Sequence, residues 1–246
     1  MDTTLSIALS HQVARRRQMD LIANNIANMS TTAFKRENVM FGEYLREANG
    51  KSPKSLRQIS FVQDFGITRN MSDGKLETTG NKFDIALSGD GMFQVQKKNG
   101  DLAYTRNGHL ALSDDYTLIT STGQAILDQG GKAIQLPPNT NDIEIASDGT
   151  ISSRAVGIIA KINVVAFADN SKLKKIGDNM FNANSPTQPA TDYTILQGVT
   201  ESSNVQAIIE ITRMIEVSRS YIKTAKLLEK LQESQSKAIN QLAKVG

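Results

Sequence analysis

Apolar residues near the start of the chain recur at the spacing of an α-helix. Met19, Ile22, Ile26 and Met29 follow one another at steps of three, four and three, which keeps an apolar stripe along one side of a helix. A Ser-Thr-Thr run follows at residues 30–32, and these residue types favour caps and turns over helix interiors. We therefore expect an amphipathic helix that ends near Met29.

A second helical pattern begins at Ser202, where Ser203 or Asn204 can cap the N-terminus of a helix. Its seam steps by four and three over roughly five heptads, through Ala207, Ile211, Met214, Ser218, Tyr221, Ala225, Leu228, Gln232, Gln235, Ile239 and Leu242. Such a stripe needs a partner, and the N-terminal helix is the obvious candidate. We expect the two helices to pair as a coiled coil.

Short alternating segments between turns occupy the middle of the chain. Residues 83–87 alternate apolar and polar side chains, and Asn99-Gly100 favours a type I′ hairpin. The longest apolar stretch, residues 156–168, predicts one or two central strands. Strands at such close spacing predict an irregular sandwich or barrel.

Glycine and proline separate these regions, because residues 1–41 and 199–245 contain neither and all five prolines lie between residues 50 and 198. The fold class predicted is mixed, with a β-rich central domain flanked by N- and C-terminal α-helices. Apolar residues between positions 30 and 70 show no clear period. The expected division is therefore an N-terminal helix at 1–29, an extended connector at 30–70, a β-rich domain at 71–200 and a C-terminal helix at 201–246.

Composition narrows the classes of function. The net charge of +3 is too small to indicate nucleic-acid binding, and the low aromatic content without tryptophan weakens a sugar-stacking or base-stacking site. No window reaches the 18 apolar residues of a membrane span. Residues 1–20 lack the order of a secretory signal peptide, so we expect any export to proceed without a cleaved signal.

Catalytic chemistry has little support. The chain has two histidines and no cysteine, which disfavours a metal site. Asp84 and Asp90 could form an acid/base pair, but Asp90 precedes a turn glycine and Asp84 is the polar member of an alternating strand. A Ser-His-Asp triad assembled only in space stays an alternative. We predict no catalytic, cofactor-binding or metal-binding residue and no small-molecule substrate.

Several motifs together resemble those of the bacterial flagellar axial family, whose members build the rod and hook. The N-terminal motif is carried by residues 23–28 and 31–35, with Ala33 where many members have glycine. The central motif is carried by residues 79–93 and 104–108, with Lys82 where a proline is common. The C-terminal motif is carried by Gly198, Ser203, Asn204, Val205, Glu210, Met214, Ile215, Arg219 and Tyr221.

This resemblance implies a non-enzymatic subunit of the flagellar basal-body rod, which crosses the periplasm. Its terminal helices would form an inner tube that transmits motor torque, and its partners would be other rod subunits and the flagellar type III export apparatus. Residues 6–10 and 15–20 favour a proximal-rod over a distal-rod subunit. A periplasmic peptidoglycan-binding or peptidoglycan-cleaving β protein is the alternative from another class.

The residues expected to carry assembly come from these motifs and from the two helical stripes. Asn24 and Asn28 share a helix face roughly opposite the apolar stripe, which a packed tube would bury. The full set is Met19, Ile22, Asn24, Asn25, Ile26, Asn28, Phe34, Asn204, Ile211, Met214, Tyr221 and Leu228.

Overall fold

The computed structural model describes residues 2–47, 58–138, 142–183 and 185–242, which fall into two compact units. Unit 1 contains the described residues of Met1–Ala27, Glu37–Asn70 and Gln206–Gly246. Unit 2 contains those of Asn28–Arg36 and Met71–Val205. The predicted order of helix, β-rich middle and helix is confirmed.

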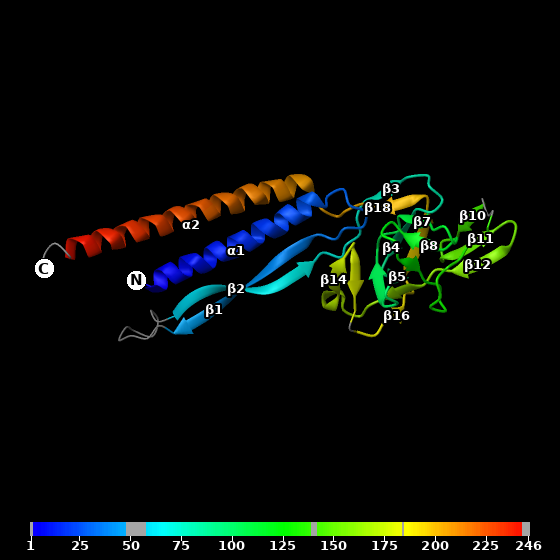
Figure 1. Ribbon diagram of the computed structural model, residues 1–246, viewed down its shortest axis with the longest axis horizontal. Helices are drawn as coiled ribbons and strands as arrows, with labels where there is room; N and C mark the ends of the chain where they lie inside the picture. Colours follow the sequence, from blue (N-terminus) through cyan, green and yellow to red (C-terminus); the bar gives the residue numbers. More distant parts are fainter. Residues whose placement is uncertain (1, 48–57, 139–141, 184, 243–246) are drawn as a thin grey trace. The chain divides into compact units, whose positions relative to one another are not determined.

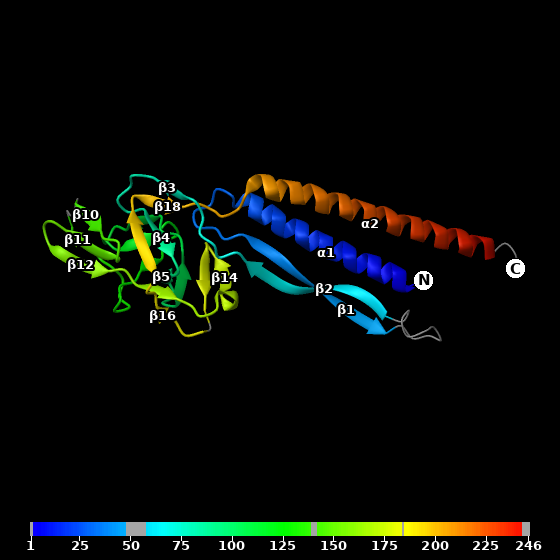
Figure 2. The ribbon, with the colours of Figure 1, turned by 180° about the vertical axis from the view of Figure 1, so that it is seen from behind.

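Unit 1 is built from two long helices and a β-hairpin, namely α1 (Asp2–Ala27), β1 (Glu37–Glu47), β2 (Gln58–Arg69) and α2 (Ala207–Leu242). The two helices lie side by side and run in opposite directions, so the start of α1 and the end of α2 lie at the same end of the unit (Figure 1). The reverse view shows α1 between α2 and the hairpin (Figure 2).

Most positions of the expected heptad seam of α2 are half-buried, namely Ala207, Met214, Ser218, Tyr221, Ala225 and Leu228. The inward side of α2 also includes positions outside this seam, among them the buried Glu210 and Val217 and the half-buried Thr224 and Leu231. Ile211 is 48% exposed, and the buried Glu210 lies beside it in sequence. The apolar spacing therefore identified most of the inward side of α2, and the exceptions among the described seam positions are Ile211 and Gln232.

The region expected to be an extended connector contains the β1/β2 hairpin. Its strands pair antiparallel from Glu37 opposite Arg69 to Glu47 opposite Gln58, with a register shift between Met40 and Phe41. The sequence pattern missed β1 because its strand pairing links distant segments without a local period. α1 ends at Ala27, two residues before the expected end.

Unit 2 is a β structure with one short 3-10 helix, η2 (Asn170–Lys172). Its strands are β3 (Leu76–Thr78), β4 (Ile85–Gly89), β5 (Met92–Gln96), β6 (Leu102–Thr105), β7 (Leu110–Leu112), β8 (Leu118–Thr120), β9 (Ala125–Ile126), β10 (Ile143–Ile145), β11 (Thr150–Ser153), β12 (Gly157–Lys161), β13 (Val164–Ala166), β14 (Lys174–Gly177), β15 (Met180–Asn182), β16 (Gln188–Pro189), β17 (Tyr193–Gln197) and β18 (Val199–Glu201).

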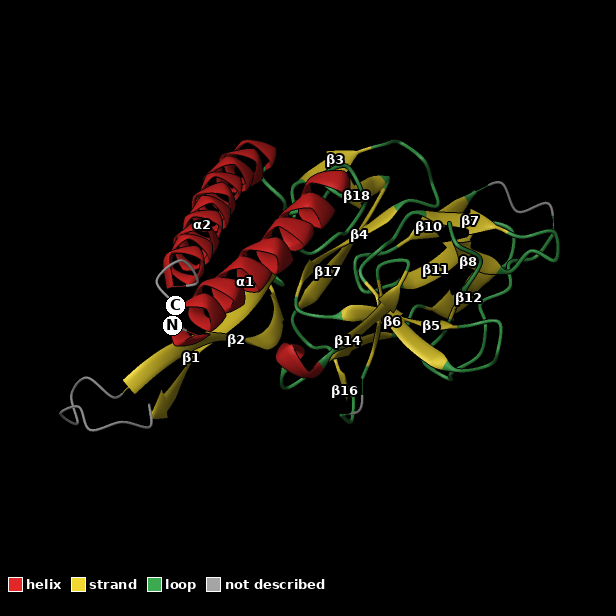
Figure 3. Ribbon diagram, turned by 60° about the vertical axis from the view of Figure 1, so that its left-hand side comes forward, coloured by secondary structure: helices red, strands yellow, loops and turns green. Residues whose placement is uncertain are grey.

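These strands form several small sheets and a larger one (Figure 3). The larger sheet has the order β14-β15-β6-β5-β9-β8-β7, and β13 also pairs with β5. The predicted Asn99-Gly100 turn joins β5 to β6, and Gly100 has a φ of 88° that suits glycine. The apolar stretch at 156–168 supplies two strands of different sheets, β12 and β13.

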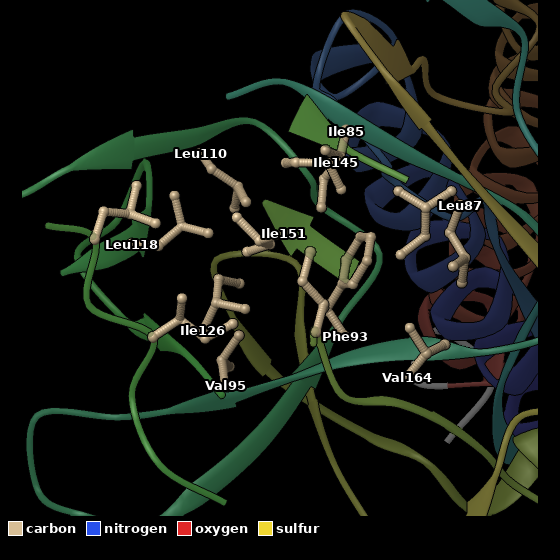
Figure 4. Close-up of a cluster of buried hydrophobic side chains, with 14 of the residues drawn as sticks. Ile85, Leu87, Phe93, Val95, Leu110, Leu118, Ile126, Ile145, Ile151 and Val164 are labelled. Atoms are coloured by element: carbon tan, nitrogen blue, oxygen red, sulfur yellow. The ribbon is translucent and has the colours of Figure 1, made fainter. Parts of the chain in front are cut away.

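Besides a smaller apolar cluster that contains Tyr104 and Phe181, one large cluster of buried apolar side chains fills the space between these sheets. Leu87, Phe93, Val95, Ile126 and Ile151 are all fully buried in it and point toward one another (Figure 4). The alternating pattern of residues 83–87 is only partly realised, because Ile85, Ala86 and Leu87 are all buried. Neither helix, over the residues described, has an 18-residue stretch apolar enough to span a membrane.

Candidate assembly site

The three asparagines of the N-terminal motif have different surroundings. Asn24 is exposed on α1, whereas Asn25 is 1% exposed. Asn28 is half-buried and begins unit 2, where its carbonyl accepts a hydrogen bond from the Thr31 backbone N–H at 3.2 Å. The motif therefore has a structural role within the chain at Asn25, beyond any role in assembly.

The Asn25 side chain binds the backbone of β1 in both directions. Its Nδ2 donates to the Glu37 carbonyl at 2.8 Å, and its Oδ1 accepts from the Glu37 N–H at 3.0 Å. The second Nδ2 hydrogen is donated to Glu210 Oε2 of α2 at 3.2 Å. An amide is the side chain that can donate and accept in this way.

Two arginines complete this group, which we call the Asn25 cluster (Asn25, Glu37, Arg69, Glu210 and Arg213). Arg69 Nε donates to Glu37 Oε1 at 2.9 Å across the hairpin, and Arg213 Nη1 lies 3.4 Å from Glu210 Oε1. The cluster contains a residue from each of α1, β1, β2 and α2. It therefore links all four elements of unit 1.

In unit 2, Ala33 and Phe34, which follow the Asn28 turn, are buried. Ala33 has a φ of +56°, in the left-handed region that favours glycine, and is 2% exposed. Phe34 is 1% exposed, and the Lys175 ammonium lies 4.2 Å from the centre of its ring. That distance permits a cation–π interaction.

Lys35 is a buried cation, and its side chain is 1% exposed, like that of Glu201. Its Nζ donates to Glu201 Oε1 at 2.6 Å and to the Ser72 carbonyl at 2.8 Å. Burial lowers the pKa of Lys35, and the neighbouring Glu201 carboxylate opposes that shift. A buried charge is tolerated in proteins when it is paired and hydrogen-bonded in this way.

Asn204 binds the same region from the chain that precedes α2. Its Oδ1 accepts from the Arg36 N–H at 2.8 Å, its Nδ2 donates to the Ser72 carbonyl at 2.9 Å, and its N–H donates to the Phe34 carbonyl at 3.3 Å. These bonds use the side chain that was expected as a possible helix cap. Ser203 instead accepts the Val205 N–H at 3.2 Å.

The Gly74 N–H donates to Glu201 Oε1 at 2.8 Å, and Arg106 Nη1 lies 3.9 Å from Glu201 Oε2. Arg106 Nη2 also lies 3.2 Å from Asp73 Oδ1. We call the group formed by Lys35, Ser72, Asp73, Gly74, Arg106, Glu201 and Asn204 the Lys35 cluster. Its two cations and two carboxylates balance in charge.

Asp84, of the central motif, is buried and organises a turn. Thr79 Oγ1 donates to its Oδ2 at 2.6 Å, Asn81 Nδ2 donates to its Oδ1 at 3.2 Å, and the His109 ring nitrogen Nδ1 lies 2.7 Å from Oδ1. Asp90 is exposed beside the Gly91 turn. Among the residues described, no group of three or more His, Asp or Glu side chains could hold a metal ion.

The remaining predicted residues lie along the two helices. Ile22 is buried, Ile211 is exposed, and the others are half-buried: Met19, Ile26, Met214, Tyr221 and Leu228. Sequence reasoning missed the buried roles of Glu37 and Glu201. No local sequence pattern identifies Glu37 as buried. Glu201 stands where the strand pattern of the middle region ends and the helical pattern of the C-terminal region begins, and that position does not predict its burial.

Three family descriptions match this chain. Residues 5–35 match "Flagella basal body rod protein", residues 86–153 match "Flagellar hook protein FlgE/F/G D1 domain", and residues 196–242 match "Flagellar basal body rod FlgEFG protein C-terminal". The matched regions include Asn25, Lys35, Glu201 and Glu210. Each of the two buried clusters therefore contains residues from both terminal regions that match the family.

Individual relatives agree with the family descriptions. The chain is 38% identical to the flagellar basal-body rod protein FlgF of Caulobacter vibrioides, with 100% of both chains covered. It is 31% identical to FlgF of Mesorhizobium japonicum over 98% of both chains. It is 33% identical to the rod protein FlgG of Buchnera aphidicola over 85% of this chain and 87% of that one. The chain therefore belongs to the family of flagellar basal-body rod proteins and is a structural subunit of the rod, similar to FlgF.

Proposed function

We propose that the chain is a proximal-rod subunit that assembles through its terminal helices into an axial tube and transmits motor torque. One observation carries this proposal. α2 packs against α1 and still exposes a second apolar row, formed by Ile208, Ile211, Ile215 and Ile222, with exposed fractions of 82, 48, 47 and 49%.

This row has the spacing of an association surface. Its members are separated by three, four and seven residues, so they share one face of α2. Contiguous exposed apolar surface marks a site of protein association. We propose that neighbouring rod subunits cover this row, with α1 and α2 packing as a coiled coil beneath it.

The motif residues have two roles in this proposal. Asn25, Phe34 and Asn204 hold the chain in its folded form. Asn24 and Asn28, together with the helix residues Met19, Ile22, Ile26, Ile211, Met214, Tyr221 and Leu228, form or support the assembly surfaces. The proposed division is a helix at 1–29, a connector at 30–70, a β-rich domain at 71–200 and a helix at 201–246.

We further propose that the chain lies in the rod across the periplasm, next to other proximal and distal rod subunits. The flagellar type III apparatus would export it without a cleaved signal peptide. Its role is structural rather than enzymatic, and it needs no cofactor, small-molecule substrate or nucleic acid. Family membership supports these assignments.

Purified basal bodies test the proposed assembly surface. A chain with Ile211→Ser and Ile215→Ser should fold with an unchanged thermal melt and should be missing from basal bodies, because its apolar row is broken. Glu216→Gln, an exposed change on the same helix, is the matched control and should be present. Wild-type amounts of the double serine variant in basal bodies would overturn the proposal.

Two further experiments separate the alternatives. Complementation should restore swimming to a strain that lacks its FlgF and should leave a strain that lacks its FlgG non-motile. The reverse result would identify a distal-rod subunit.

Incubation with peptidoglycan should release no muropeptides. Release that is lost in Asp84→Asn or Asp90→Asn would refute a purely structural role.

A further inference from the structure

The Lys35 cluster lies where the chain leaves unit 2. The chain passes between the units after Ala27, after Arg36, after Asn70 and after Val205. Three segments of unit 2 adjoin the crossings after Arg36, Asn70 and Val205 in sequence, namely residues 33–36, 72–74 and 201–204. We call them the exit segments, and all contribute residues to the Lys35 cluster.

Each pair of exit segments is joined by hydrogen bonds. The Ala33 N–H donates to the Glu201 carbonyl at 2.7 Å, and Asn204 Oδ1 accepts the Arg36 N–H, so the first and third segments are joined. Lys35 Nζ joins the first segment to the Ser72 carbonyl. The Gly74 N–H joins the second segment to Glu201.

Charge couples these bonds to one another. Glu201 Oε1 accepts from both Lys35 Nζ and the Gly74 N–H, so one carboxylate oxygen serves all three exit segments. The Lys35 and Glu201 side chains are each 1% exposed. Removal of either partner leaves the buried cluster with one unbalanced charge, since Arg106 and Asp73 balance each other, and an unbalanced buried charge is strongly unfavourable. Detachment of one segment therefore weakens the hold on the other two.

We propose that Lys35 and Glu201 are positioning residues that make the three exit segments open and close as one cooperative unit. A pull on the chain at any of these points is then shared by all three segments, and no single segment peels away from unit 2 by itself. The consequence for torque rests on the proposed rod function, whereas the cooperative opening does not.

Amide hydrogen exchange on the full-length chain tests the cooperative opening. The amides of Ala33, Arg36, Gly74 and Asn204 should share one free energy of opening in the wild-type protein, after each rate is corrected for its intrinsic exchange rate. Lys35→Met or Glu201→Gln should accelerate exchange of all four by about 100-fold. The Leu127 amide, which donates to Gln94 in the core, should be unaffected. Acceleration confined to the segment that carries the substitution would overturn the proposal.

Two further variants sharpen this test. Lys161→Met removes a cation from an exposed pair with Asp148 in the same unit and should leave the exit segments unchanged. The double variant Lys35→Met with Glu201→Gln contains no uncompensated charge at these positions. The exit-segment amides of this double variant should exchange more slowly than the combined effects of the two single substitutions predict. The double variant also keeps the test possible if a single variant fails to fold. Strict additivity of the two effects would refute the coupling.

Swimming under raised viscosity tests the mechanical consequence separately. Bacteria with Glu201→Gln should keep the subunit in their basal bodies and should lose speed more steeply than wild type as viscosity increases. Equal speeds, together with accelerated exchange, would retain cooperative opening and overturn its mechanical role. Absence of the wild-type chain from basal bodies would instead overturn the proposed rod function and leave the exchange result standing.

Discussion

The neighbouring residues Asn24 and Asn25 have opposite environments, and their chemistry follows from this difference. Asn25 uses both amide hydrogens and its carbonyl oxygen within the fold, whereas Asn24 is exposed on the same helix. The buried side-chain amide of Asn25 forms hydrogen bonds with the N–H and the carbonyl of Glu37 in β1, as the backbone of a neighbouring strand would. Because an amide without its partners is costly in a dry interior, Asn25 is predicted to be less tolerant of substitution than Asn24.

Replacement of Asn25 by Leu should lower the free energy of unfolding of unit 1 by about 2–3 kcal/mol, because the Glu37 backbone and the Glu210 carboxylate lose their partners. Denaturant unfolding followed by helical circular dichroism measures this change. Asn24→Leu is the comparison and should stay within about 0.5 kcal/mol of wild type, as exposed substitutions usually do. Equal destabilisation by both changes would show that the bonds of Asn25 contribute little.

Ala33 adopts a backbone conformation that suits glycine better. Its φ of +56° costs an ordinary residue on the order of 1 kcal/mol, whereas glycine adopts it freely. Ala33→Gly should therefore leave the thermal melt of unit 2 unchanged or raise it slightly, since added freedom in the unfolded chain offsets part of the gain. Ala33→Val should lower the melt, because a β-branched residue is strained at positive φ. A lower melt for glycine than for valine would contradict this explanation.

Asp148 predicts a defined dependence of stability on pH. The hydrogen bond from Lys161, followed by those from the Thr150 backbone and hydroxyl, lowers the pKa of Asp148 from 3.8 to about 2. A carboxyl with a depressed folded-state pKa stabilises the fold above its unfolded pKa, and this contribution disappears as the pH falls through the folded value. The stability difference between wild type and Asp148→Asn should be present at neutral pH and should shrink between pH 3.8 and about 2.

Thermal melts of both proteins across this range measure the effect. A constant difference between wild type and Asp148→Asn at all pH values would show that the ion pair with Lys161 does not couple to folding.

At the scale of elements, local periodicity predicted what depends on local sequence. The α1 and α2 helices, the Asn99-Gly100 hairpin and the short strands of unit 2 were all predicted from spacing and turn residues. The β1/β2 hairpin was missed, because strand pairing between distant residues such as Glu37 and Arg69 has no local signal. Most of the inward seam of α2 was predicted, but Ile211 is exposed, and the apolar spacing did not identify the buried charged residue Glu210.

Deletion of residues 207–246 should leave unit 2 folded. Its core residues, including Ile85, Phe93 and Ile195, all lie within unit 2, and removal of α2 takes nothing from that core. The near-ultraviolet spectrum and the core amide protection of unit 2 should therefore persist. The truncated chain should be missing from basal bodies, because α2 carries the exposed apolar row. Restoration of swimming by the truncated chain would show that α2 is dispensable.

At the scale of the whole molecule, the family motifs identified important positions without revealing their partners. Asn25, Phe34 and Asn204 were selected from motifs, and each is held by specific contacts in the structure. The partners Glu37 and Glu201 could not be predicted, since tertiary packing alone brings them to Asn25 and Lys35. A residue that a family motif predicts to act in assembly can therefore make its main contacts within its own chain.

Substitutions at Asn24 on α1 and at Asn28 in the turn that follows α1 should affect assembly alone. Asn24 is exposed and Asn28 is half-buried at a turn, where Asn28 Oδ1 accepts from the Thr31 hydroxyl. An aspartate at either position keeps a similar shape and an acceptor oxygen, so the thermal melt of the isolated chain should not change. In a packed rod, a carboxylate on this face would be buried without a partner at a cost of several kcal/mol. Asn24→Asp and Asn28→Asp should therefore be missing from basal bodies.

The control for this experiment must lie on the exposed surface. Glu37→Gln is unsuitable, although Glu37 lies outside the motif, because Glu37 is 7% exposed and pairs with Arg69. Asp20→Asn, an exposed change of similar size on α1, should enter the rod normally. If both aspartate variants appear in basal bodies at wild-type levels and support swimming, then this face of α1 remains in water in the assembled rod. In that case the Asn24 and Asn28 positions of the motif would have no role in assembly.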